Sequence, residues 1–427
     1  MRGPREGAAG GVPGRRGRPY VRRGRPALLV PAAVCALFAL SPGPAAAADG
    51  DGALPAVSAV PPQGGGCVRP SPRKMTQVPW PQRYIAPSRA WDTTRGEGVT
   101  VAVVDTGVDA GHSPALAGRA VAGPDVTTGA AHAAGTDCVG HGTFVAGLIA
   151  AAELPGQGFA GVAPRARVLA VRVTDRDGAA SADHVAAGIG AAVAGGARIV
   201  DVPLALPRGS AALTAAVRDA QRHGALVVAP AYGEADPSAS GDPDAPAPAA
   251  YPAALDGVLA VASLGPGGAP DQQAAPRTAP DIAAPGTAVM SVGPGGPGHF
   301  TGSGADLATG FVAGAAALVG AAHPESTPAQ VRARLLATAY PMVTAGRPLV
   351  GAGTVDPSAA VSTPMPAGAT PEAAAPPAPV ALAARASHRG RGTAVAVAGG
   401  ALGAALLTGF AAFTVARARR RGWRPGI

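Results

Sequence analysis

The stretch VTVAVVDTGVD, residues 99–109, decides the fold. It opens with a mainly apolar run at 99–104, which has a glycine before it and Asp105 after it. A short run of this kind is typical of a parallel strand that is buried on both faces. Functional groups of open α/β sheets lie at the carboxyl ends of such strands. Asp105 is therefore the first candidate for a functional residue.

The sequence that follows this strand alternates between strand and helix patterns. Further strands are predicted at residues 167–173, 198–202 and 225–229. Helices are predicted at residues 141–152, 184–194, 213–223, 306–323 and 328–338, the last with Thr327 as its cap. This order of elements predicts one α/β domain at 76–357, with a mainly parallel sheet flanked by helices.

The chain is basic overall, but its positive charge lies at the two ends. The formal net charge is +9, from 35 basic and 26 acidic residues. Eight arginines fall in residues 1–26 and eight in 385–427, which leaves 19 basic and 25 acidic residues between these segments, because Glu6 belongs to the first. Arginine clusters beside apolar runs are membrane-topology signals. This distribution excludes nucleic acid as a partner of the central domain.

Residues 1–48 have the pattern of a signal peptide. A basic segment is followed by an apolar run at 27–40 and then by small residues up to Ala48, where cleavage is expected. The pair Arg22-Arg23 also allows the twin-arginine route, although the residues that usually flank this motif are missing. An N-terminal extension at 49–75 follows.

A second apolar run, at 393–416, is uncharged and long enough to span a bilayer. Five arginines follow it, so we expect 417–427 to be a cytoplasmic tail and the main domain to be extracellular. Residues 358–392 are rich in proline and alanine and are predicted to be an extended linker. The alternative is that 393–416 forms a buried, glycine-rich helix.

Three cysteines occur, and Cys35 lies in the predicted signal peptide. Cys67 and Cys138 are then an even pair in an exported domain, for which a disulfide is the default expectation. Two free thiols or half of a metal site are the alternatives. No acidic loop resembles a calcium site, and the histidines at 112, 132, 184 and 299 are scattered. We therefore expect no metal and no cofactor.

His141 is the second candidate for a functional residue. It lies between two glycines in the stretch GHGTFVAG, residues 140–147, at a predicted helix start. An aspartate such as Asp105 can hold a histidine in one tautomer and stabilise its protonated form. Each motif alone is weak evidence, whereas the two together with GVAP at 161–164 are strong evidence for a hydrolase site.

With these motifs the chain resembles the subtilisin-like serine proteases, and among them the mycosins, the membrane-anchored proteases of type VII secretion systems. The resemblance covers roughly residues 67–357. Asp137-Cys138 just before the Gly-His-Gly-Thr motif, with Cys67 upstream, is typical of mycosins. Matching stretches occur at 79–92, 328–339 and 353–357. The resemblance implies that the extension at 49–75 wraps the domain and is not a removable inhibitor.

The resemblance assigns catalytic roles to Asp105 and His141, as the aspartate and histidine of a Ser-His-Asp triad. The family's nucleophilic serine lies six residues before a Val-Ala-Gly sequence, which is found here at 312–314. That position is occupied by Asp306.

The oxyanion position falls at or near Gly233, with no asparagine available. At 202–204 the chain has Val-Pro-Leu where the family's substrate-binding strand has Ser-Leu-Gly, and Pro203 lacks an N–H for pairing with a peptide.

These three departures predict a catalytically impaired domain. Ser303 is an alternative nucleophile, but it lies three residues upstream of Asp306, and catalysis tolerates displacements of only about 0.5 Å. Asp306 could itself attack an amide, but it would have to do so without an oxyanion hole. More plausibly, Asp306 stabilises the helix N-terminus and, if it faces His141, raises the pKa of that ring above its usual value.

Two functions follow from the resemblance. The first is an anchored structural or peptide-binding component of a type VII secretion system, with peptide or protein ligands. The second is an active serine endopeptidase that processes secreted proteins. A cell-wall-facing binding module unconnected to secretion is a third and weaker hypothesis.

Overall fold

The structure is a computed structural model, which describes residues 53–59, 66–233, 249–270, 278–342, 349–365 and 389–422. The predicted signal peptide, most of the predicted linker and the end of the basic tail lie outside these residues. Their assignments stay predictions.

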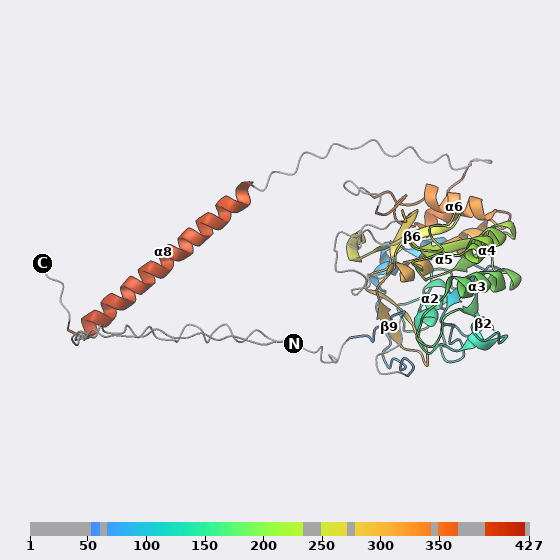
Figure 1. Cartoon of the computed structure of the whole chain (residues 1–427), viewed down its shortest axis with the longest axis horizontal. Coiled ribbons are helices and arrows are strands. Elements are labelled where there is room, and N and C mark those ends of the chain that lie inside the picture. Colours follow the sequence, from blue (N-terminus) through green and yellow to red (C-terminus); the bar gives the residue numbers. More distant parts are fainter. Residues whose placement is uncertain are drawn as a thin grey trace, which may run out of the picture. The chain divides into compact units, whose positions relative to one another are not determined.

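A seven-stranded sheet forms the centre of the domain (Figure 1). Its strand order is β2-β3-β1-β4-β5-β6-β7, and every neighbouring pair is parallel. The strands are β1 (Thr100–Asp105), β2 (Ala120–Asp125), β3 (Arg167–Arg172), β4 (Ile199–Asp201), β5 (Leu226–Pro230), β6 (Leu259–Leu264) and β7 (Ile282–Pro285). A separate antiparallel hairpin contains β8 (Val289–Val292) and β9 (His299–Gly302). The prediction of an α/β domain with a mainly parallel sheet is confirmed.

The five helices predicted within the domain begin and end close to the predicted positions. The helices of the structure are α1 (Trp80–Tyr84), α2 (His141–Ala150), α3 (Ala182–Ala194), α4 (Ala211–Arg222), α5 (Ala305–Ala322), α6 (Pro328–Ala337), α7 (Pro357–Ser362) and α8 (Arg389–Arg420). Helices α1 and α7 were not predicted, and α7 lies at the start of the predicted linker. Short 3₁₀ helices occur at Pro87–Ala90, Ala133–Gly135 and Pro266–Gly268. Helix α3 starts two residues earlier than predicted because Ser181 is its cap and accepts a hydrogen bond from the His184 N–H.

Strand β1 is buried on both faces, as its apolar pattern predicts. Val101 and Val103 pack with the side chains of α2 and α5, whereas Ala102 and Val104 pack with those of α3 and α4. Two helical layers therefore cover the sheet. This arrangement explains why the strand has no polar alternation.

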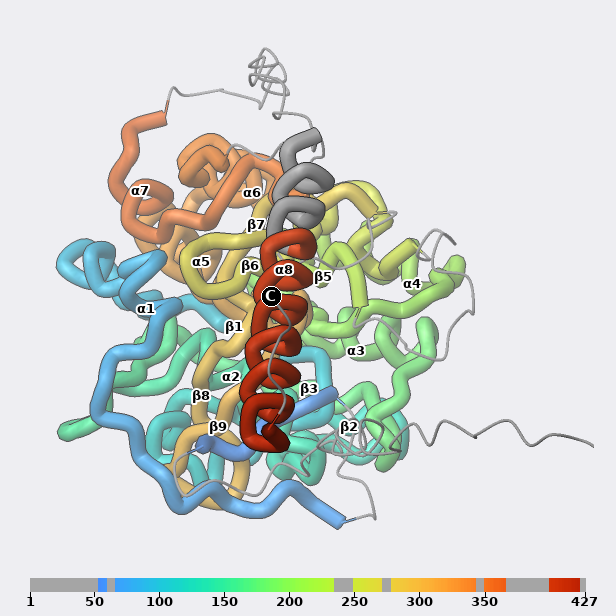
Figure 2. The backbone as a smooth tube through the Cα atoms, turned by 90° about the vertical axis from the view of Figure 1, so that its left-hand side faces the viewer, coloured from blue at the N-terminus to red at the C-terminus, as the bar shows by residue number. Residues whose placement is uncertain are grey.

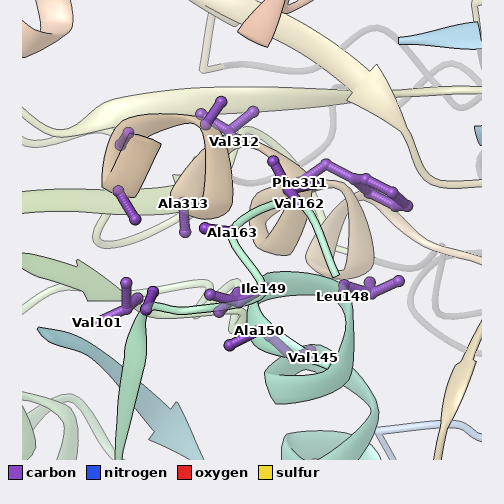
Figure 3. Packing of buried hydrophobic residues seen from close by; sticks show 14 of the residues in the cluster. Val101, Val145, Leu148, Ile149, Ala150, Val162, Ala163, Phe311, Val312 and Ala313 are labelled. Carbon is purple, nitrogen blue, oxygen red and sulfur yellow. The ribbon is translucent and has the colours of Figure 1, made fainter. Parts of the chain in front are cut away.

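Helix α5 is the central helix of the first layer and packs directly on α2 (Figure 3). Phe311 and Val312 of α5 lie in the same cluster as Val145 and Leu148 of α2. A Cβ atom on Gly314 would lie 2.6 Å from the Val162 side chain, so only glycine permits this close approach. Although α5 is long and apolar enough to cross a membrane, 83% of its apolar window is buried in the domain.

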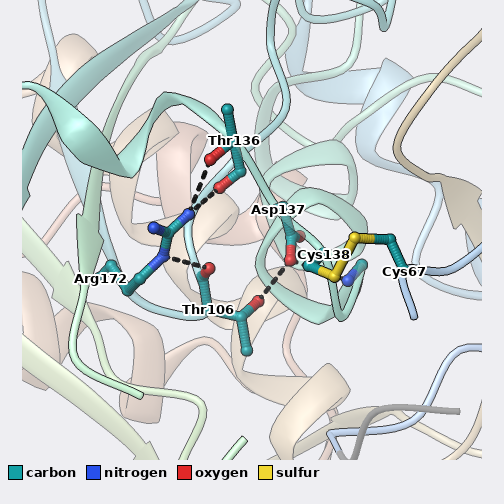
Figure 4. Close-up of a disulfide and its surroundings, with 7 residues drawn as sticks. Cys67, Thr106, Thr136, Asp137, Cys138 and Arg172 are labelled. Atoms are coloured by element: carbon teal, nitrogen blue, oxygen red, sulfur yellow. Dashed lines mark hydrogen bonds between the residues drawn. A yellow bond between two sulfur atoms is a disulfide. The ribbon is translucent and has the colours of Figure 1, made fainter. Parts of the chain in front are cut away.

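The N-terminal extension runs along the β8–β9 hairpin (Figure 2). The Val57 N–H donates to the Thr301 carbonyl at 2.8 Å, and the His299 N–H donates to the Arg73 carbonyl at 2.7 Å. A disulfide joins Cys67 to Cys138, as expected from the even cysteine pair (Figure 4). The extension is thus tied to the segment that precedes His141.

Helix α8 contains the predicted membrane span. Its apolar section is Gly399–Arg420, and none of the residues in its apolar window is buried. The helix extends beyond the predicted 393–416 at both ends. An exposed apolar helix of this length is consistent with a transmembrane anchor.

Candidate active site

Asp105 and His141 meet at the carboxyl edge of the sheet. Asp105 ends β1 and is fully buried, and His141 is the first residue of α2. The His141 Nδ1 atom lies 2.6 Å from Asp105 Oδ2. This is the geometry by which a carboxylate orients an imidazole ring and holds a proton on Nδ1.

Glycines on both sides of His141 make this approach possible. Gly140 has a φ of 91°, in the left-handed region that glycine tolerates. A Cβ atom on Gly142 would lie 2.1 Å from the Gly107 carbonyl oxygen. The Asp-Thr-Gly and Gly-His-Gly motifs are therefore in direct backbone contact.

Asp137, whose structural role the sequence does not reveal, organises the same loop. Its carboxylate accepts hydrogen bonds from the Thr106 hydroxyl at 2.9 Å, the Gly140 N–H at 2.8 Å, and both the N–H and the hydroxyl of Thr143 at 2.8 and 2.7 Å. Figure 4 shows Asp137 beside the disulfide, between Cys138 and Thr106. The only sequence signal is its place next to Cys138.

Asp306 lies on the other side of the His141 ring. It is the second residue of α5, and its Oδ2 atom lies 2.8 Å from His141 Nε2. A Cβ atom on Gly304 would lie 1.9 Å from Asp306 Oδ1, so a glycine is required beside this carboxylate. The Asp306 side chain is 15% exposed, compared with 1% for His141.

The two carboxylates determine the charge of His141. Burial alone would lower the pKa of the ring, but the charge and hydrogen bond of Asp105, followed by those of Asp306, raise it well above 6.5. A ring that donates from both nitrogens is an imidazolium. The geometry agrees with the expectation that His141 is protonated at neutral pH.

Ser303 and Gly233 lie elsewhere in the site region. The Ser303 hydroxyl accepts a hydrogen bond from the Ala288 N–H at 2.9 Å, while the Nε2 atom of His141 is engaged by Asp306. Gly233 lies near Ala205, and the chain after it, residues 234–248, is outside the described residues. Pro203 lies just beyond β4, where the neighbouring Leu204 N–H donates to the Val202 carbonyl.

The described part of the chain holds no group of three or more His, Cys, Asp or Glu residues that could bind a metal ion. Of the scattered histidines, His112 is a surface residue beside Asp109. His299 is fully buried and accepts a hydrogen bond from the Met75 N–H.

Comparisons with known proteins agree with this architecture. Residues 96–370 match the model of the subtilase family. Mycosin-3 of Mycobacterium tuberculosis is 33% identical, over 89% of this chain and 90% of its own length. The structure resembles MycP1 from Mycobacterium smegmatis, with a TM-score of 0.62 and 28% identity, over 74% of this chain and 93% of that one. It also resembles the MycP3 protease from the type VII (ESX-3) secretion system, with a TM-score of 0.59 and 32% identity, over 74% and 98%. The chain therefore belongs to the subtilase family and is mycosin-like within it.

Proposed function

We propose that this chain is a membrane-anchored component of a type VII secretion system that has the mycosin fold but does not hydrolyse peptides. It acts as a structural or peptide-binding part of the machinery. The observation that carries this proposal is the contact between Asp306 Oδ2 and His141 Nε2 at 2.8 Å.

That contact removes the general base. In a serine protease the Nε2 atom of the histidine accepts a proton from the serine hydroxyl. Here the same atom faces a carboxylate, which has no proton to give and favours a ring that is already protonated. Asp306 takes the position of the nucleophile, so both the alcohol and the base are lost.

The expected loss of rate is large. In subtilisin, a related enzyme, removing the catalytic serine lowers turnover by about 10⁶, and removing the oxyanion asparagine lowers it by about 10²–10³. Ser303 does not compensate, because the Nε2 atom of His141, which would have to accept its proton, is engaged by Asp306. An activity near the uncatalysed background is therefore expected.

The anchoring half of the proposal rests on α8 and on the relatives. The exposed apolar section of α8 is followed by arginines that favour a cytoplasmic end, which supports a location of the subtilase domain outside the membrane. The similar MycP3 structure is of a protease from a type VII secretion system. A fold that serves in such an assembly can keep its structural role after its chemistry is lost.

A fluorophosphonate probe tests the absence of hydrolysis. We expect the full chain in detergent to remain unlabelled at every serine, whereas an active mycosin labels under the same conditions. Labelling of Ser303 or of any other serine, abolished by His141→Ala, would instead support the active endopeptidase.

A complementation experiment tests the role in secretion. In a strain lacking this chain, we expect the wild-type protein, Asp306→Ala and His141→Gln to restore type VII secretion equally. A chain without residues 389–427 should fail, because it has lost its anchor. Secretion that depends on His141 but not on the anchor would contradict the proposal.

A further inference from the structure

A buried histidine, His299, joins the N-terminal extension to the hairpin. It is the first residue of β9, and its side chain is fully buried. Its Nδ1 atom lies 2.9 Å from the Met75 backbone nitrogen, and its ring centre lies 5.8 Å from that of Phe159. Its Nε2 atom is buried and has no hydrogen-bond partner within the described part of the chain. The ring is thus enclosed between the extension, β9 and the loop after α2.

The contact with Met75 determines the protonation state of the His299 ring. A backbone N–H can only donate, so the Nδ1 atom that faces it must be the acceptor. The hydrogen of the neutral ring is then on Nε2. If Nδ1 gained a proton, two N–H groups would face each other and the hydrogen bond would be lost. The geometry therefore requires a neutral ring.

The surroundings of His299 do not compensate a positive charge. Strand β8 and the rest of β9 have no titratable side chain, and Glu153, an acid in the loop after α2, is ion-paired with Arg95. The extension adds two cations, Arg73 and Lys74. Burial lowers the pKa of the His299 ring, and no charged group among the described residues opposes this effect.

Two further hydrogen bonds adjoin this contact. The His299 N–H donates to the Arg73 carbonyl at 2.7 Å, and the Gly158 N–H donates to the Met75 carbonyl at 3.1 Å. A Cβ atom on Gly158 would lie 2.3 Å from the Gln77 carbonyl oxygen, so the extension is in close contact with this loop. Since these bonds meet at His299 or at the residue that it binds, we expect them to open together.

The chain on either side of this segment is held independently. Upstream, the disulfide joins Cys67 to Cys138. Downstream, the Trp80 indole N–H donates to the Ala288 carbonyl at 2.9 Å. The segment between these two attachments can therefore open without release of the whole extension.

We propose that His299 is an acid-operated latch, in which protonation of Nδ1 releases residues 71–77 from β9 and from the loop after α2. In the open form the ring titrates near its usual value of about 6.5. The latch therefore contributes fully above that pH, and its contribution falls as the pH drops from there to the lower value of the closed form. Over that range the opening constant rises by up to about tenfold per pH unit. This inference does not depend on whether the protein hydrolyses peptides.

Hydrogen exchange of the full chain in detergent tests the latch. The Met75 and Gly158 amides are protected by the closed segment, so their exchange reports its opening. In His299→Asn the side-chain oxygen can accept from the Met75 N–H but cannot take up a proton at these pH values. The ratio of wild-type to variant rates cancels the intrinsic effect of pH and should rise as the pH falls from 6.5 to about 4.5, by up to about tenfold per unit. A constant ratio would overturn the proposal.

Two further variants assign the effect to this ring. His223→Asn changes a histidine that is 60% exposed just after α4, and it should keep the pH dependence of the wild type. His299→Phe removes the acceptor, so the two amides should exchange faster at every pH, without the rise at acid pH. If the acid-dependent rise persists in His299→Phe, another group opens the segment and the proposal is wrong.

NMR of ¹⁵N-labelled histidine gives a readout on the wild-type chain alone. The His299 signals are assigned by their absence in His299→Asn. At pH 7 the ring should carry its hydrogen on Nε2 and none on Nδ1, and protonation of Nδ1 should accompany the opening seen by hydrogen exchange. A hydrogen on Nδ1 at pH 7, or a ring that stays neutral after the segment has opened, would contradict the proposal.

Discussion

The two sides of the His141 ring are built differently. On the Nδ1 side, Asp105 holds the ring and Asp137 accepts four hydrogen bonds from the surrounding loop. On the Nε2 side, Asp306 has one carboxyl oxygen without a hydrogen-bond partner among the described residues, and Asp201 has two. On the first side Asp137 forms a satisfied network, although Asp105 Oδ1 also lacks a hydrogen-bond partner among the described residues, whereas on the second side neither acid is fully satisfied.

This difference shows where the site depends on protons. A satisfied network keeps its geometry at any pH at which its carboxylates stay charged. Unpaired acids change their charge instead, because burial without partners penalises the ionised form. Proton dependence is not confined to the Nε2 side, because burial also raises the pKa of Asp137, and Asp105 is the first of the groups that raise the pKa of His141 against the effect of burial. We expect loss of the Asp137 hydrogen bonds to lower stability at all pH values, and variants of Asp306 to act mainly on how stability depends on pH.

Replacement of Asp137 should have the largest effect. Asp137→Ala leaves four buried donors without an acceptor, and each unsatisfied group costs about 1–3 kcal/mol, with incomplete additivity. We expect a loss of at least about 3 kcal/mol in the free energy of unfolding, measured by urea titration of the full chain in detergent. A loss below about 1 kcal/mol would contradict the view that this network organises the loop.

Removal of the disulfide should have the next largest effect. Cys67 and Cys138 are 71 residues apart in the sequence, so the bond restricts a long loop in the unfolded chain. The double variant Cys67→Ser, Cys138→Ser should lose about 2–4 kcal/mol of unfolding free energy at all pH values. A loss seen only at alkaline pH would contradict this expectation, because it would show that the bond acts through a titrating group.

Asp306→Asn should have a smaller effect that varies with pH. The raised pKa of His141 contributes stability that is complete below about pH 6.5 and is lost as pH rises through the higher folded value. Removing the Asp306 charge lowers that folded value, so the variant should lose less stability between neutral and alkaline pH. The difference is about 1.4 kcal/mol for each pH unit by which the pKa falls. Identical pH profiles would show that Asp306 does not stabilise the imidazolium.

The sequence predicted the fold because the fold depends on strong local patterns. The apolar run before Asp105 and the long apolar helix that contains Phe311 are buried for the reasons that their composition indicates. Strands β2, β6, β7, β8 and β9 were missed. β2 mixes buried and partly exposed positions, and Pro124 falls within it, so it lacks the uninterrupted apolar pattern.

The site was only partly predictable. Asp306 was found because it lies six residues before the Val-Ala-Gly sequence at 312–314. In the structure its Oδ2 atom lies 2.8 Å from His141 Nε2. The role of Asp137 depends on a hydrogen bond between segments that are distant in sequence, which no local pattern reports. Asp201 carried a signal that could have been read, because an acid inside an apolar strand pattern is unusual.

The protonation state of His141 tests the account most directly. In the full chain with ¹⁵N-labelled histidine, the ring can be assigned by its absence in His141→Gln and followed by NMR from pH 5 to pH 9. Two protonated nitrogens at pH 7 are predicted, with the proton lost only well above that pH. A ring that is neutral at pH 7, with Nε2 free to accept a proton, would contradict the account and restore the base that a serine protease requires.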